Sequence, residues 1–226
     1  EHPATIQPHN GEDGLLNHDA GSWPSQVLFT LNGDDTELKL EGLILNGVEP
    51  EVNNSLFGIA TARGARQKII VEECILSSFR HLYFSTFGTQ TDFYIMNSVA
   101  KEWLNGPGGM FFGGIVWGGG SWMGTIDTIV VQNNTIEGVL GEAIVIFEHV
   151  DYGIVDHNTF TNVNLNPIWR KGQNNLQVTN NLFYNCKSYG QSTYDINNWG
   201  VWYSGGVGQM SLMQSSGNGA TSGTYM

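Results

Sequence analysis

The sequence predicts an all-β protein in which successive turns of one chain stack into a parallel solenoid. Three segments, residues 128–139, 152–163 and 175–186, share one pattern: a strand with alternate apolar residues, an Asn-containing corner and a second apolar pair. The third strand position recurs as Val131, Val155 and Val178, at spacings of 24 and 23 residues. A fixed period in this range indicates structural repeats. Because no helical periodicity lies between the segments, each repeat is predicted to be one coil of strands.

The pattern divides the chain into three parts. Residues 1–36 form an N-terminal loop and first partial coil, residues 37–186 form the coils, and residues 187–226 form a final partial coil and a Gly/Ser-rich tail. Short strands are expected at 4–6 and 27–31, followed by a turn at 32–35. Six coils then open at 38, 69, 93, 129, 153 and 176, with insertions expected at 49–67 and 105–127. Strands of a seventh coil are expected at 199–203 and 209–213, before a flexible end at 215–224.

The columns of this alignment predict the core and one polar stack. The first and third strand positions of each coil are almost all apolar and are expected to point inward, with Gly153 as the gap. The corner column reads Asn134, Asn158 and Asn181 in the last three coils. We expect these side chains to stack as an Asn ladder, because amide–amide hydrogen bonds offset the cost of burying polar groups at a bend.

These residues resemble a known group of proteins. The motifs Asn133-Asn134-Thr135-Ile136 and Asn180-Asn181-Leu182-Phe183, within a pattern that covers residues 38–186, are similar to right-handed parallel β-helix proteins. That superfamily includes pectate lyases and NosD-like surface proteins. The resemblance implies a single-domain right-handed parallel β-helix of about six to seven coils. It leaves the function open, because the superfamily holds lyases, hydrolases, epimerases, phage tailspikes and non-catalytic adhesins.

Charge and composition exclude several classes of partner. The chain has 9 Lys and Arg residues against 21 Asp and Glu residues, for a net charge of -12. This charge disfavours nucleic acid and anionic membrane surfaces as partners. No apolar run is long enough for a membrane span, and the composition is typical of a secreted or cell-surface bacterial β-protein. The chain opens on Glu1, so we expect a processed N-terminus or a segment of a longer protein. Cys74 and Cys186 fall about four coils apart and are expected to be free, buried thiols.

The long connections between coils hold the residues that suit chemistry on polysaccharides. A lyase needs a base beside a uronate and cations, or Ca²⁺, to neutralise the carboxylate. The weak catalytic candidates are His149, Arg170, Lys171, Glu148 and Glu142. Candidates for glycan contact are Trp169, Arg80 and His81. The simpler interpretation of Glu148 and Lys171 is a salt bridge between adjacent rungs.

Other polar residues favour structural roles. Glycoside hydrolysis needs paired carboxylates, yet the matching position offers only Asp156, with Gln132 and Thr179 expected beside it in the neighbouring coils. His157 takes the place of Asn at a corner, which favours a hydrogen-bonded structural residue. The histidines show no metal-ligand spacing, so no cofactor and no metal site are predicted, and Ca²⁺ enters only the enzyme hypothesis.

An apolar stripe on the outside of the coils points to a partner. The second strand position should face solvent, yet in four successive coils it reads Ile70, Tyr94, Val130 and Ile154. A continuous apolar stripe on a solvent face is normally covered, either by another part of the same chain or by a partner. The favoured hypothesis is a non-catalytic extracellular or cell-surface protein with a structural, adhesive or assembly role. Its partners would be other surface proteins, copies of itself stacked laterally or end to end, or polysaccharide. The alternative is a polysaccharide lyase, a glycoside hydrolase or a carbohydrate-binding module for an acidic glycan.

Overall fold

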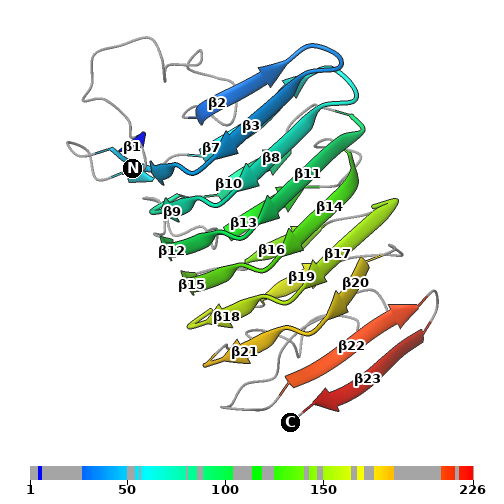
Figure 1. The fold of residues 1–226 in the computed structure, drawn as a ribbon. Coiled ribbons are helices and arrows are strands. Elements are labelled where there is room, and N and C mark those ends of the chain that lie inside the picture. Colours follow the sequence, from blue (N-terminus) through cyan, green and yellow to red (C-terminus); the bar gives the residue numbers. More distant parts are fainter. Residues whose placement is uncertain are drawn as a thin grey trace.

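The computed structural model describes most of the coiled region and parts of both ends of the chain. The described residues are 5–6, 27–49, 54–55, 57–79, 81–85, 89–103, 114–118, 125–139, 143–146, 150–163, 167–170, 176–185, 210–216 and 219–225. Over these residues the chain winds as a stack of parallel coils, and each coil adds one strand to each of three sheets (Figure 1).

Sheet C contains the strand that opens each predicted coil. Its six strands lie in sequence order: β3 (Glu37–Glu41), β8 (Lys68–Glu72), β11 (Thr91–Met96), β14 (Ile126–Gln132), β17 (Tyr152–Asp156) and β20 (Leu176–Thr179). All neighbours are parallel, and Val131, Val155 and Val178 are direct register partners. The alignment predicted from the sequence is therefore confirmed.

Sheet A follows sheet C around a sharp corner. Its strands are β1 (Thr5–Ile6), β4 (Ile44–Asn46), β9 (Ile75–Ser77), β12 (Val99–Trp103), β15 (Thr135–Val139), β18 (Thr159–Thr161) and β21 (Leu182–Tyr184). At the corner, Asn134, Asn158 and Asn181 are buried, and Asn134 Nδ2 and Asn158 Nδ2 each donate to the next side-chain oxygen at 2.9 Å. The Asn ladder is confirmed.

Sheet B contains the strand expected at 27–31 and otherwise occupies the segments that the sequence alignment treated as insertions and connections. Its strands are β2 (Val27–Asn32), β7 (Phe57–Arg63), β10 (His81–Ser85), β13 (Gly114–Gly118), β16 (Ile144–Ile146) and β19 (Ile168–Arg170). β7 lies inside the expected insertion 49–67, and β13 lies inside the expected insertion 105–127. These segments thus contribute a third wall of the coil, a correction to the sequence interpretation.

The three sheets enclose one continuous apolar core. Phe160 and Phe183, from adjacent rungs of sheet A, stack with ring centroids 5.0 Å apart, and Tyr83 stacks on Phe93 across the core at 4.9 Å. Gly153 is the gap in the inward column, as expected. A Cβ there would lie 2.6 Å from Leu176 Cδ1, so neighbouring side chains already fill the space. Like residues on successive rungs pack at the strand spacing of about 4.8 Å.

Left-handed residues turn the chain between sheets C and A. The corner column contains Gly42, Glu73, Asn97, Asn133, His157 and Asn180, all with φ between 52° and 66°. Asn tolerates this conformation better than most residues, because its short polar side chain bonds locally. The repeated Asn-Asn pair thus has two roles: the first Asn makes the turn, and the second joins the ladder.

Two antiparallel pairs depart from the coil. β5 (Val48–Glu49) pairs with β6 (Asn54–Ser55), and β22 (Met210–Ser216) pairs with β23 (Gly219–Tyr225) along its full length. The β22–β23 hairpin lies at the C-terminal end of the stack (Figure 1). The strand expected at 209–213 is present as β22, but it pairs antiparallel in a hairpin instead of joining a coil, and much of the expected flexible end 215–224 is β-strand. The expected strand 199–203 lies outside the described residues.

Candidate functional site

The outer face of sheet C carries the predicted apolar stripe as one file of side chains. Tyr94 is the register partner of both Ile70 and Val130, and Val130 is the partner of Ile154. Val130 is buried, and the other three are partly buried. Lys39 and Gln177 continue the file at its two ends. We call these four apolar residues the middle column.

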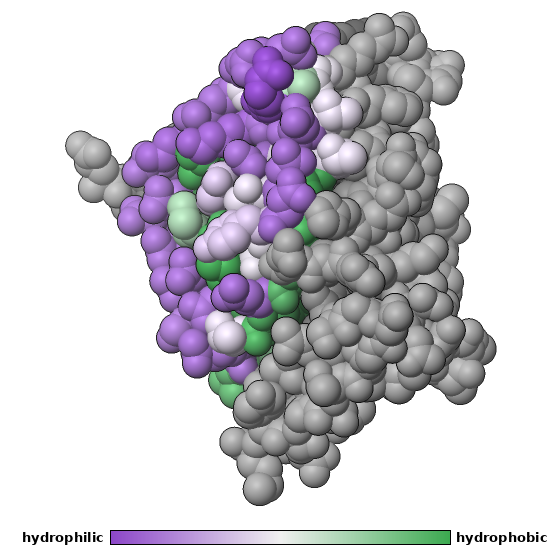
Figure 2. All heavy atoms as spheres, turned by 90° about the vertical axis from the view of Figure 1, so that its right-hand side faces the viewer, coloured by the Kyte–Doolittle hydropathy of each residue, from purple (hydrophilic) through white to green (hydrophobic). Residues whose placement is uncertain are grey.

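Charged residues flank the middle column on both sides. One flanking column holds Glu37, Lys68, Asp92, Thr128 and Tyr152, and the other holds Glu41, Glu72, Met96, Gln132, Asp156 and Thr179. Lys68 Nζ lies 3.5 Å from Glu37, and Lys39 Nζ lies 2.6 Å from Glu41 and 3.8 Å from Glu72. Both lysines of the face are thus engaged by glutamates at its N-terminal end, and carboxylates exceed cations. On the described surface, hydrophobic patches (green) lie among hydrophilic residues (purple) in Figure 2.

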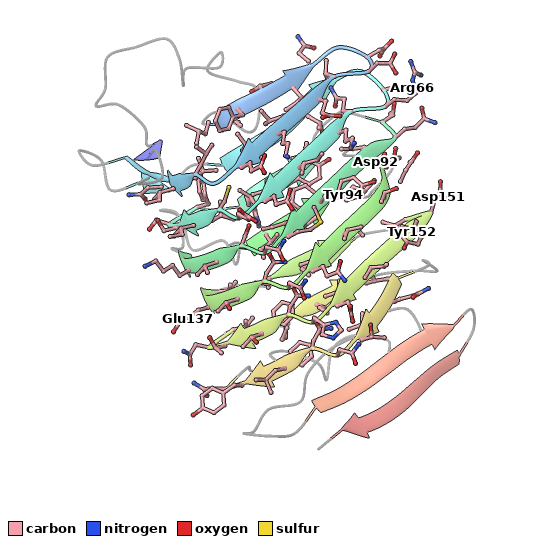
Figure 3. All side chains as sticks on the ribbon, viewed as in Figure 1. Arg66, Asp92, Tyr94, Glu137, Asp151 and Tyr152 are labelled. Atoms are coloured by element: carbon pink, nitrogen blue, oxygen red, sulfur yellow. The ribbon has the colours of Figure 1, made fainter. Side chains whose placement is uncertain are left out.

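Tyr94 is the centre of an aromatic and charged cluster on this face. Lys68 Nζ lies 5.9 Å from the centroid of its ring, within the range of a cation–π contact. Burial, and next the charge of Asp92, raise the pKa of the Tyr94 hydroxyl. Asp92 and Tyr94 lie on β11, and Asp151 and Tyr152 lie at the start of β17 on the same side (Figure 3). Tyr152 is 49% exposed and offers an open ring.

Asp156 is the most heavily bonded carboxylate of the face. Its Oδ1 accepts from Thr179 Oγ1 at 2.6 Å and from Asn180 Nδ2 at 3.0 Å. Its Oδ2 accepts from Gln132 Nε2 at 3.3 Å and lies 2.6 Å from His157 Nδ1. The Thr179 bond, followed by the His157 bond, holds the pKa of Asp156 well below its usual range. The carboxylate is therefore ionised at neutral pH, as hydrogen bonds to the charged form dictate.

The Asp156–His157 pair fixes the imidazole at the corner. Because an ionised carboxylate only accepts hydrogen bonds, His157 Nδ1 carries the proton and donates it. The Asp156 side chain is 13% exposed and the His157 side chain is 58% exposed. The contact agrees with the prediction that His157 is a hydrogen-bonded corner residue. The expected neighbours of Asp156, Gln132 and Thr179, are its direct register partners.

Three of the predicted catalytic and glycan-contact residues lie on strands of sheet B. Trp169 and Arg170 lie on β19, in register with Val145 and Ile146. His81 lies on β10 and is 1% exposed, so its side chain is not at the surface and the expectation of glycan contact is corrected. β10, which the sequence alignment did not include, buries His81 together with Leu82 and Tyr83. The residues Glu142, Glu148, His149, Lys171 and Arg80 lie outside the described residues.

The sequence reasoning missed a second set of outward apolar residues on sheet A. Ile75 and Val99 are register partners and are each 38% exposed, and Leu182 and Tyr184 at the C-terminal end are also exposed. The sequence does show apolar residues at the first strand position after the corner in several coils, as at Ile75 and Val99. That column turns to Thr135 and Thr159 in the middle of the stack, so its apolar part is interrupted.

The described residues contain neither a cluster of metal ligands nor a membrane-spanning helix. Among them, no group of three or more His, Cys, Asp or Glu side chains is arranged to hold a metal ion. The same residues include no helix of the length and apolarity that a membrane crossing needs. Cys74 is buried and free, and Cys186 lies outside the described part of the chain.

The three-sheeted parallel coil and its asparagine ladder define the chain as a right-handed parallel β-helix protein. Crossovers between parallel strands of one sheet are right-handed in nearly all proteins. Residues 113–216 match a family described as "Right handed beta helix region", a match that runs from the segment of β13 into β22. No curated protein and no solved structure matches the sequence significantly. The sheets continue unbroken from the matched coils into the earlier ones.

Proposed function

We propose that the protein is a non-catalytic extracellular or cell-surface β-helix of the NosD-like surface type, with an adhesive or assembly role. The outer face of sheet C would be its partner-binding surface. One observation carries the proposal: Ile70, Tyr94, Val130 and Ile154 form a register-aligned apolar file on an outward face. An outward sheet face that is polar elsewhere gains nothing from such a file unless another surface covers it.

The energetics of the face favour binding over a purely structural role. Covering apolar surface contributes about 25 cal/mol per Å² removed from water. The middle column lies on successive rungs of a rigid stack, so little conformational entropy is lost when a partner covers it. The polar and charged columns beside it resemble the rim of a protein interface.

The charge of the face bears on the alternative function. A lyase, a hydrolase or a module for an acidic glycan would bind a polyanion, and the excess of carboxylates on sheet C repels one. That alternative therefore rests on the connection residues His149, Arg170 and Lys171. A screen for unsaturated uronate products, on the wild type and on Arg170→Ala and Lys171→Ala variants, tests it directly.

Two measurements test the proposed binding face. Hydroxyl-radical footprinting of the monomeric full chain should label Tyr94, Tyr152 and Ile154, because the face is open. Binding of the wild type and of an Ile70→Thr/Ile154→Thr variant to immobilised basic, acidic and neutral proteins should then be compared. The variant should bind at least one of these proteins more weakly than the wild type does. Threonine keeps the β-branched shape, so the strand is preserved.

A matched change on sheet A provides the control. Val99→Thr removes the same kind of apolar group from the other outward face and should leave adhesion unchanged. Protection of the sheet C residues in the monomer would mean that the chain covers its own face. Loss of adhesion with Val99→Thr alone would move the binding surface to sheet A. Either result overturns the proposal.

A further inference from the structure

We propose that the partner of the sheet C face is a basic, amphipathic, extended segment of another protein. Its apolar side chains would cover the middle column, and its Lys and Arg side chains would meet the flanking carboxylates. This inference rests on the proposed function and goes further by naming the chemistry of the partner.

The charge of the face is the first argument. Its three outward columns contain five carboxylates, Glu37, Glu41, Glu72, Asp92 and Asp156, against two lysines, Lys39 and Lys68. With His157 neutral the difference is 5 − 2, a net charge of -3, and the whole chain carries -12. Complementary charge accelerates encounter and excludes like-charged partners, so a basic surface is selected.

The distribution of the two lysines strengthens this argument. Both are paired with glutamates at the N-terminal end of the face, at 2.6 to 3.8 Å. The outward columns of β11, β14 and β17 contain no Lys or Arg, although they include Asp92 and Asp156. A partner therefore meets the carboxylate of Asp156 and no cation in the outward columns on the rungs of Val130 and Ile154.

The aromatic residues supply a place for a cationic side chain. The ring of Tyr94 is already contacted by Lys68 Nζ at 5.9 Å, so the aromatic ring left for a partner's cation is that of Tyr152. Tyr152, in the flanking column of Asp92, has an open ring with Asp151 beside it (Figure 3). Aromatic rings together with carboxylates attract ammonium and guanidinium groups. A basic side chain placed between Tyr152 and Asp92 would therefore be stabilised both by the aromatic ring and by the carboxylate.

Two other occupants fit the face less well. A second copy bound through the same face would place carboxylates against carboxylates, because a two-fold contact uses the same patch on both molecules. A cationic polysaccharide would match the charge. Its hydroxyl-covered chain would, however, leave the aliphatic groups of Ile70, Val130 and Ile154 poorly matched, whereas apolar side chains match them.

The test uses the full chain and synthetic probes that differ in charge. The probes are short fluorescent peptides in which Val alternates with Lys, Glu or Ser, together with chitosan oligosaccharides. Fluorescence anisotropy at low and high salt gives each affinity. The Lys–Val peptide should bind most tightly and should weaken with salt, since exposed charges are screened within about 10 Å at 0.1 M.

Variants localise the contact. Asp92→Asn and Tyr152→Ala should each weaken binding of the Lys–Val peptide, by about tenfold together. Glu137→Gln, which removes an exposed carboxylate from sheet A, is the charge-matched control and should have no effect. An equal loss with Glu137→Gln would mean non-specific attraction to the acidic chain and would overturn the inference.

The outcomes separate the two proposals. Equal or tighter binding of the Glu–Val or Ser–Val peptide at this face overturns the basic partner and leaves the binding face intact. Chitosan binding without peptide binding overturns the protein partner. Failure of all probes, with Tyr152 and Ile154 protected from footprinting, overturns both proposals.

Discussion

Asn158 Oδ1 accepts two hydrogen bonds from Asn134, one from the backbone amide at 3.0 Å and one from Nδ2 at 2.9 Å. Asn181 Oδ1 accepts the same pair from Asn158, at 2.8 and 2.9 Å. Each asparagine also donates Nδ2 to a strand carbonyl of a preceding coil, as Asn158 does to Val131 at 2.8 Å. The ladder therefore joins side chain to side chain and side chain to backbone in one buried file.

Replacing the central member of this file should be costly. Asn158→Ala removes an acceptor of two bonds and a donor to Val131, leaving buried groups unsatisfied. We expect the free energy of unfolding to fall by about 3 kcal/mol, since each unsatisfied buried group costs about 1–3 kcal/mol. Urea unfolding followed by circular dichroism measures it. Asn162→Ala, which removes an exposed Asn185–Asn162 bond, should cost about 1 kcal/mol, mostly from its left-handed conformation. Equal losses would show that the buried ladder adds no stability of its own.

Two glycines with positive φ should respond differently to substitution. A Cβ on Gly64, at φ +121°, would lie 2.2 Å from the Gly33 carbonyl oxygen, which is backbone and cannot rotate away. Gly64→Ala should therefore cost about 3 kcal/mol. Gly42, at φ +66°, has nothing within 4 Å and sits in the column where Asn97, Asn133 and Asn180 make the same turn. Gly42→Asn should stay within about 1 kcal/mol of the wild type. Thermal unfolding of both variants checks the ranking, and a reversed order would contradict it.

Asp156 should make the protein sensitive to acid. Its folded-state pKa lies below the unfolded value of about 3.9. The unfolded chain thus takes up the proton first as pH falls. The stability from Asp156 is complete above that value and is lost progressively below it. We expect the stability difference between wild type and Asp156→Asn to be constant at neutral pH and to shrink below about pH 4.

A second variant ties this effect to its cause. Thr179→Val removes the hydrogen bond that lowers the pKa of Asp156 most and should raise that pKa toward its ordinary value. Carbon-detected NMR of the Asp156 carboxyl group across the acid range measures it. An unchanged titration in Thr179→Val would mean that Thr179 is not responsible.

Cys74 should be inert in the folded protein. Burial raises the pKa of its thiol, and Sγ donates to the Glu72 carbonyl at 3.2 Å. Ser98 one coil later bonds the Met96 carbonyl in the same way, at 2.7 Å. In a Cys186→Ser background, a thiol reagent should label Cys74 only at the rate of unfolding. Cys74→Ser should fold, because a hydroxyl makes the same bond. Rapid labelling without denaturant would contradict the buried position.

The sequence was most informative where one residue type repeats at one structural position. Val131, Val155 and Val178 were placed in register from spacing alone, and the corner asparagines followed. Side-chain alternation then identified the outward middle column. These features depend on local patterns of period 2 and on the nearly constant length of the last three coils, both of which can be recognised without tertiary information.

Apart from the strand at 27–31, the strands of sheet B could not be predicted in the same way. Its strands follow connections of unequal length, and some of its inward positions are polar, as with Thr61 and His81. Without a constant spacing its strands could not be aligned as a column, so only the strand at 27–31 was predicted, and β7 and β13 were taken as insertions. The hydrogen-bond network around Asp156 was only partly predicted from the sequence. Its register partners Gln132 and Thr179 were found, but the contacts of Asn180 and His157 with the carboxylate depend on the turn geometry.

The file of Asn134, Asn158 and Asn181 has a consequence for how such a chain changes length. In the last three coils the same side-chain oxygen accepts hydrogen bonds at the same corner, so each of these coils is an interchangeable module. An in-frame duplication of the 24 residues from Val131 to Ile154 would extend the structure by one coil without redesigning its interior. A gene encoding this fold can therefore lengthen by duplicating whole coils. Inserting a few residues at the corner would instead take an asparagine out of the ladder.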